Sequence, residues 1–162
     1  MPVAADTDLF EAHVGVRHAG LREWQPHLVC SLVGWLTDEC QSLSVPCCIE
    51  PFPSSRSLAA RLYRNTAFAR RVRDRLGPTA NLQIVQANDH LEGLLALALA
   101  RTLGARAAML LRSPGMTRAD YFKYRCQDFD FVAAVGDELR ARAAGWDPAR
   151  TVHLIHDGIA PS

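Results

Sequence analysis

The stretch LQIVQANDHLEGLLALALARTLGARAAMLLRSPG, residues 82–115, decides the fold. Its first apolar run, Leu82–Ala87, predicts a buried strand, and the alanine- and leucine-rich run Leu91–Leu103 predicts a helix that Gly104 closes. A second strand is expected at Arg106–Arg112. Because both strands are apolar throughout instead of alternating, we expect a parallel sheet that helices cover.

The same alternation continues on both sides of this unit. We expect further strands at Leu28–Val33, Val45–Phe52, Phe129–Gly136 and Thr151–His156, and helices at Trp35–Leu43, Ser57–Leu76, Thr117–Cys126 and Asp137–Ala144, the last closed by Gly145. No repeat, low-complexity segment or internal linker divides the chain. The sequence therefore predicts one α/β domain over residues 1–162, a doubly wound, mostly parallel, Rossmann-like sheet of about six strands with helices on both faces.

The first 25 residues are ambiguous. Apolar residues between Asp8 and Glu23 have a loosely helical spacing, whereas the alternation from Phe10 to Val16 also suits a half-buried strand. A sheet of this kind normally opens with a central strand of about five or six apolar residues. Only Pro2–Ala5 precede the expected helix. The first strand is therefore very short, or the chain begins late.

Composition narrows the function classes. Eighteen basic and 17 acidic residues, spread along the chain, leave a net charge of +1 and no footprint for nucleic acid. Lys123 is the only lysine, which excludes a phosphate-binding Gly-Lys loop. Five cysteines without a secretory signal favour reduced thiols in the cytoplasm. The longest apolar stretch, Leu94–Ala100, is too short to span a bilayer, which leaves at most peripheral contact with the inner membrane face.

In a doubly wound sheet, ligands bind beyond the carboxyl ends of the strands. Asn88, Asp89 and His90 follow the strand at Leu82–Ala87 directly. Asp89 could accept a hydrogen bond from an acceptor hydroxyl, and His90 could exchange protons near neutrality, with Asn88 beside them as a binding residue. The alternative is that Asn88 or Asp89 caps the helix that follows, and the two roles can coexist.

The next such turn holds Arg112, Ser113 and Gly115. Arg112 could pair with a phosphate or carboxylate, and Gly115 would let a backbone N–H approach a ligand. The alternative is a surface arginine ahead of a Pro-Gly turn.

Two further turns complete this edge. Gly136 lies at the start of a helix, where an anion could bind, although the neighbouring Asp137 would repel phosphate and suits an N-cap. Asp157 and Gly158 are expected at the mouth of the cleft, either binding substrate or simply forming a turn.

Metal and membrane sites are less favoured by the pattern. Cys47 and Cys48 form no C-x2-C motif, and His153 and His156 would point to opposite faces of a strand, so no metal or cofactor is expected. The basic helix at Ser57–Leu76 could press on an anionic membrane, but a solvated face explains its arginines equally.

Two long segments resemble the N-terminal domain of retaining family-4 glycosyltransferases. They are IVQANDHLEGLLALALARTLGARAAMLLRSPGM, from Ile84, and FDFVAAVGDELRARAAGWDPARTVHLIHDGI, from Phe129. The family has a strand ending in a His- or Asn-Asp element, an Ala/Leu-rich helix, a strand ending in His-Ser or His-Asp, then "iavSealr" and "vhvIpNGvd". The order and spacing match over roughly the last 80 residues, and HLVCSLVGWLTDECQSLSVPCCIEPFP is similar to earlier family elements.

This resemblance implies the acceptor-side half of a GT-B enzyme. In such enzymes a nucleotide-sugar rests mainly on a C-terminal domain that carries a Glu-x7-Glu element, and a hexosyl unit passes with retention to a glycan or lipid-linked acceptor. The sequence lacks that domain, so the chain is expected to be inactive alone. It also departs from the family in two places: no glycine-rich loop occurs within Val3–Asp8, and Arg112 stands where the family has a histidine near the transferred sugar.

Two other function classes remain. A non-catalytic Rossmann- or flavodoxin-like binding module would explain the missing glycine loop and the arginine at position 112. An NAD-dependent oxidoreductase is weakly supported, because no G-x-G-x-x-G follows a strand.

Overall fold

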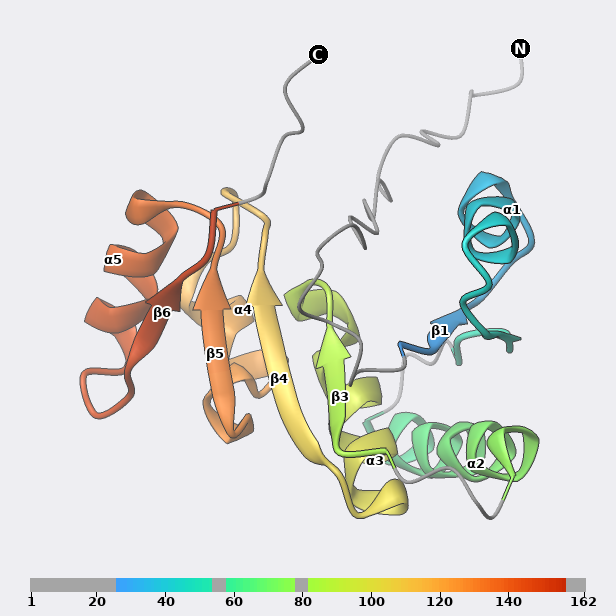
Figure 1. Ribbon diagram of the computed structural model, residues 1–162. Coiled ribbons are helices and arrows are strands. Elements are labelled where there is room, and N and C mark those ends of the chain that lie inside the picture. Colours follow the sequence, from blue (N-terminus) through green and yellow to red (C-terminus); the bar gives the residue numbers. More distant parts are fainter. Residues whose placement is uncertain (1–25, 54–57, 78–81, 157–162) are drawn as a thin grey trace, which may run out of the picture.

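The computed structural model describes residues 26–53, 58–77 and 82–156, apart from the side chains of 58–62 (Figure 1). The expected strand at Pro2–Ala5 and the helix at Asp8–Glu23 lie outside this range. The chain is α/β, and every described strand pairs in parallel with its neighbour. In order the elements are β1 (Leu28–Cys30), α1 (Trp35–Ser42), β2 (Cys47–Ile49), α2 (Leu58–Leu76), β3 (Ile84–Ala87), the 3-10 helix η1 (His90–Glu92), α3 (Gly93–Leu103), β4 (Arg106–Leu111), α4 (Arg118–Lys123), the 3-10 helix η2 (Cys126–Asp128), β5 (Phe131–Ala134), α5 (Asp137–Trp146) and β6 (Val152–Leu154).

The strands form two sheets. Strands β3, β4, β5 and β6 pair in that order, side by side in Figure 1, while β1 pairs with β2. One continuous six-stranded sheet was therefore a wrong prediction for the described residues. The physical reason is that β1 hydrogen-bonds only toward β2 and β3 only toward β4, so no described strand links the two sheets.

One face of the four-stranded sheet carries the main core. The pairing register places Ala87, Met109, Val132 and Val152 on the same face, and all four are buried in a cluster with residues of α3, α4 and α5. Sequential right-handed crossovers put successive helices on the same side of a sheet, in agreement with this cluster.

The opposite face of the same sheet is more open. Ile84 is 46% exposed and Phe131 is 39% exposed, and the Phe131 ring stacks on exposed His153 at 4.4 Å between centroids. Helix α2 packs instead on α3 and β2, through Phe68, Ala69 and Val72. Helices on both faces of this sheet are thus not observed within residues 82–156.

Helix ends follow local signals where glycine adopts a left-handed backbone. Gly104 has φ of 68° and its N–H bonds back to Ala100, closing α3 where the sequence predicts. Gly145 does not close α5, contrary to prediction, and the helix runs on to Trp146. Trp146 packs against the buried Tyr121 at 5.9 Å between ring centroids and lies under the Arg142 guanidinium, so tertiary packing extends the helix.

The first strand is shorter than the apolar run Leu28–Val33 predicts. It stops at Cys30, and Leu32 and Val33 are 77% and 71% exposed. Helix α1 then begins after Gly34, where the Thr37 hydroxyl donates to the Gly34 carbonyl at 2.6 Å. The strand ends early because residues 31–34, part of which the apolar run predicts as strand, form the turn into α1 instead.

Glu50 ties the basic helix α2 to strand β2. Its side chain is almost fully buried and accepts from Arg71 at 2.5 Å, while Arg75 lies 3.1 Å from its second oxygen. Arg75 also donates to the Ile49 carbonyl at 2.7 Å. Arg71 and Arg75 therefore already make contacts within the chain, and a membrane contact of the helix would compete with those contacts. No described helix is long and apolar enough to cross a membrane.

Candidate functional site

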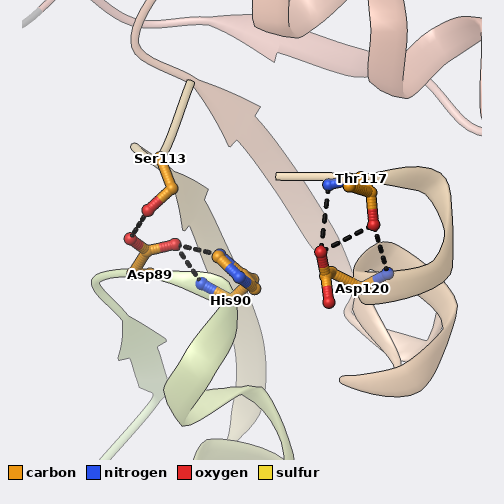
Figure 2. A network of polar contacts seen from close by, with 5 residues as sticks. All are labelled: Asp89, His90, Ser113, Thr117 and Asp120. Atoms are coloured by element: carbon orange, nitrogen blue, oxygen red, sulfur yellow. Dashed lines mark hydrogen bonds and ion pairs between the residues drawn. The ribbon is translucent and has the colours of Figure 1, made fainter. Parts of the chain in front are cut away.

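The turns after β3 and β4 lie side by side. Both strands run in parallel, Ala87 pairs with Met109, and the turns that follow begin at Asn88 and Arg112. The Ser113 hydroxyl donates a hydrogen bond to Asp89 Oδ2, which joins the two turns directly (Figure 2). The neighbourhood that the sequence predicts for these turns is therefore confirmed.

Asp89 is the centre of this network. Its Oδ1 accepts from the backbone N–H of His90 at 2.5 Å and lies 2.5 Å from His90 Nδ1. Asp89 is also the N-cap of η1, with an extended backbone. The capping alternative is thus confirmed, while contact of Asp89 with an acceptor hydroxyl stays a prediction.

The arrangement differs from a nucleophilic triad. A serine nucleophile needs a histidine beside it to take its proton, with the carboxylate behind the histidine. Here Asp89 lies between Ser113 and His90, so the serine donates its proton to a carboxylate hydrogen bond. The carboxylate holds both groups in place, which suits binding and orienting hydroxyl groups better than acyl transfer.

His90 is held from two sides. Its side chain is buried, with 7% of the residue exposed, and its ring packs edge-on against Tyr124 at 5.3 Å between centroids. Because Asp89 engages Nδ1, Nε2 is the ring nitrogen left to exchange a proton with a ligand.

A second polar pair lies beside the network in Figure 2. The Thr117 hydroxyl donates to Asp120 Oδ2 at 2.6 Å, and the Asp120 N–H donates back to Thr117 Oγ1 at 3.2 Å, which caps α4. The Thr117 hydroxyl bond is the main reason that the pKa of the Asp120 carboxyl is lowered, with a smaller contribution from His90. This pair caps the N-terminus of α4, and Tyr124 at the other end of that helix packs against the His90 ring.

Glu92 is a candidate that the sequence did not single out. Burial raises the pKa of its carboxyl, and the nearby Asp89 charge raises it further. Its Oε2 is buried and has no hydrogen-bond partner within the described residues. Together with Asn88 it lines a cavity of about 780 Å³. The signal in the sequence is the spacing, since a residue three positions after Asp89 falls on the same side of a helical turn.

The other expected residues of the β3 and β4 turns, Asn88, Arg112 and Gly115, also lie at this edge. Asn88 is half-buried, and its Oδ1 accepts a long bond of 3.4 Å from Gln86. Arg112 is half-buried directly after β4. Gly115 is exposed, and a Cβ there would meet open space, so the described backbone gives no steric reason for glycine.

Gly136 lies at the carboxyl end of β5, the neighbour of β4, and is the N-cap of α5 with φ of −149°. Asp137 is the first residue of that helix and lies 3.3 Å from Arg140, so the expectation that Asp137 is the cap was wrong. Gly136 caps because its extended backbone already orients the carbonyl toward the Arg140 N–H. Asp157 and Gly158 lie outside the described residues.

Comparison with known proteins finds no match: no protein-family model, curated protein or solved structure matches the chain. Within residues 26–53, 58–77 and 82–156, no three His, Cys, Asp or Glu side chains are placed to share a metal ion.

Proposed function

We propose that this chain is the acceptor-side half of a two-domain, retaining GT-B glycosyltransferase of the family-4 type. The proposal includes a Rossmann-like arrangement of its sheet. The reaction would move a hexosyl unit from a nucleotide-sugar to a glycan or lipid-linked acceptor, with the donor bound mainly by a second, C-terminal domain. Support comes from the motif order in the sequence and from the polar network at the carboxyl edge of a parallel sheet.

The observation that carries the proposal is the Asp89 carboxylate between two neighbouring turns. Ser113 already gives it an alcohol O–H, the same group that a sugar acceptor presents. An acceptor hydroxyl that replaced Ser113 at Asp89 Oδ2 would meet similar chemistry, with the carboxylate fixed by two contacts from His90. Orientation of this kind lowers a barrier because the reacting groups no longer search for their geometry.

The neighbouring residues have roles that fit this scheme. His90 Nε2 would exchange a proton near the acceptor, and Arg112 would pair with a phosphate or carboxylate of either substrate. Gly136 would offer the N-terminus of α5 to an anion. The partner domain would complete the chemistry, largely by electrostatic stabilisation of the departing diphosphate.

The test needs a protein that contains this chain and a donor-binding half. Asp89→Asn should lower kcat by about tenfold or more, equivalent to about 1.4 kcal/mol of barrier. Asp130→Asn is the matched control, because Asp130 binds the Ala107 N–H at 2.7 Å at the far edge of the sheet and should leave kcat unchanged. Full activity of Asp89→Asn, or equal losses in both variants, would remove Asp89 from the site.

A second function is favoured because Asp89 is already engaged within the chain. Both of its oxygens already accept hydrogen bonds within the chain, and Arg112 replaces the family's histidine, as in a binding module without catalysis. Such a module would bind a nucleotide or sugar and show no transfer in any two-domain context. A thermal-shift screen with nucleotides and sugars, run beside the transfer assay, distinguishes the two functions.

A further inference from the structure

Two cysteines of the small sheet lie against each other. Cys30 ends β1 and Cys47 begins β2, and their sulfur atoms are 3.6 Å apart. The pairing register puts Leu28 opposite Cys47, so Cys30, two residues further along β1, points to the same face of the sheet. Cys47 is exposed and Cys30 is half-buried, which leaves the pair open to small reagents from solvent.

We propose that Cys30 and Cys47 form a reversible disulfide, which makes the pair a thiol-modification site for low-molecular-weight disulfides such as oxidised glutathione. A disulfide bond is about 2.05 Å long, so the two sulfurs must approach each other by about 1.5 Å. This movement is shared between two side chains on two short strands. Because the sulfurs are already in contact, ring closure is intramolecular and is favoured over capture of a second molecule.

The reaction is thiol–disulfide exchange and needs only the oxidant as co-reactant. One sulfur of the pair, as the thiolate, attacks a sulfur of oxidised glutathione, whose S–S bond breaks and releases a glutathione thiolate. The other sulfur of the pair then gives its proton to water, attacks the mixed disulfide and releases the second glutathione. The two protein thiols lose two electrons and two protons, which the oxidant gains as it becomes two thiols.

The other three cysteines are less suited to this reaction. Cys48 follows Cys47 directly, so it points to the opposite face of the strand, where it is buried. Cys40 and Cys126 are fully buried, and Cys126 lies in the core of the four-stranded sheet. A buried thiol meets a dissolved oxidant only when the chain opens. The Cys30–Cys47 pair therefore combines contact between sulfurs with access from solvent.

The bond would tie β1 to β2 covalently. Within the described residues β1 pairs with β2 alone, over three residues on each strand. The disulfide closes a span of 17 positions that contains α1, and it restricts the chain whenever this unit opens. Cys30 also lines the cavity that Asn88 and Glu92 line. Oxidation of the pair thus fixes one wall of the cavity beside the candidate site.

Treatment of the whole 162-residue chain with oxidised glutathione tests the proposal. Partial burial, and then the hydrogen bond with Cys30, raise the pKa of Cys47 to about 11, so exchange is slow near neutrality and the reaction is run at about pH 8.5. Mass spectrometry after cleavage at Glu39, between the two cysteines, should find peptides joined through Cys30 and Cys47. Dithiothreitol should separate these peptides again.

Serine variants and a matched cysteine control locate the bond. Cys30→Ser and Cys47→Ser should each abolish the cross-link and leave a glutathione adduct on the cysteine that remains. Cys126→Ala removes a cysteine outside the small sheet and should keep the cross-link.

Amide hydrogen exchange of the unaltered chain gives a readout that needs no variant to fold. The N–H groups of β1 and β2 should exchange at least about tenfold more slowly in the oxidised chain than in the reduced chain, with β5 and β6 unchanged. The proposal is overturned by glutathione adducts without a cross-link in the unaltered chain, or by a cross-link through Cys40 or Cys48 instead. A bond that forms only between two copies of the chain, or equal exchange at β1 and β2 in both forms, would overturn it as well.

Discussion

At the residue scale, Asp89 performs two tasks with one carboxylate. It caps η1 and it fastens the turn after β4 to the turn after β3. A side chain with both tasks couples local stability to the shape of the candidate site, so its removal affects folding as well as binding. The helix cap and the ligand role, which are alternatives in the sequence, are thus physically linked here.

The link between the turns is measurable as a coupling energy. Asp89→Ala should lower the free energy of unfolding by about 1–3 kcal/mol and Ser113→Ala by about 1 kcal/mol, since each leaves a partner without its hydrogen bond. The loss of unfolding free energy in the double variant should be smaller than the sum of the two single losses, by at least about 0.5 kcal/mol, because both variants remove the same shared bond. Urea unfolding of the chain measures all three.

Ser42→Ala is the control for these unfolding experiments. Its hydroxyl donates to the Glu39 carbonyl at 2.8 Å on an exposed helix end, so its loss should cost less than about 0.5 kcal/mol. Strictly additive effects of Asp89→Ala and Ser113→Ala would show that the two turns are independent.

Glu92 should make stability depend on pH. Burial raises the pKa of its carboxyl in the folded chain above the ordinary value of 4.5. The folded protein therefore binds the proton more tightly than the unfolded chain, and this contribution to stability is full at low pH and is lost as pH rises through the raised pKa. Glu92→Gln carries no charge at any pH. The stability of this variant relative to the unaltered chain should therefore increase from about pH 4, the ordinary range of a carboxyl pKa, toward neutrality.

Unfolding curves at several pH values between acid and neutral test this expectation. Glu39→Gln, at an exposed position on α1, serves as the control and should show a much smaller pH dependence. A stability difference for Glu92→Gln that stays constant over the whole pH range would contradict the buried, ionisable state of Glu92.

At the element scale, two helical glycines should respond oppositely to the same change. A Cβ on Gly93, the first residue of α3, would lie 2.5 Å from the Tyr124 carbonyl oxygen, so Gly93→Ala must displace backbone and should cost about 1–3 kcal/mol. A Cβ on Gly145 would meet open space inside α5, so Gly145→Ala should stabilise by about 0.5–1 kcal/mol. Thermal unfolding of the two variants checks both signs, and a stable Gly93→Ala protein would show that α3 and Tyr124 are not held so closely.

The elements show what periodicity can and cannot predict. The strand, helix and strand at residues 82–112 follow from apolar runs and from Gly104, because these signals are local. The extension of α5 past Gly145 depends on Trp146 meeting Tyr121, a contact with no local signal. The end of β1 at Cys30 was not predicted for the same reason.

The candidate site shows the same division. Asn88, Asp89 and His90 could be placed because a polar run after a buried strand must lie at the edge of a parallel sheet. The bond from Ser113 and the burial of Glu92 depend on how two turns pack, which no spacing encodes.

At the scale of the whole molecule, two packing units meet at α3. Ala96, Leu97 and Ala100 of that helix pack into the core of the four-stranded sheet, whereas Leu99 packs on α2 and β2. Helix α3 is therefore the described element that holds the small sheet against the large one, across the cavity between them.

The charges at the carboxyl edge predict weak donor binding by the isolated chain. Asp89, Glu92 and Asp120 lie close enough to influence one another or His90, and Arg112 is the cation expected to meet a phosphate there. A diphosphate that approaches this edge meets several carboxylates at short range, which opposes binding. If the donor rests mainly on a second domain, the chain alone should bind nucleotide-sugars no better than about millimolar, or about −4 kcal/mol. Isothermal calorimetry with nucleotide-sugars measures this directly. Micromolar affinity would mean that the chain carries a donor site of its own, and the acceptor-side assignment would then be wrong.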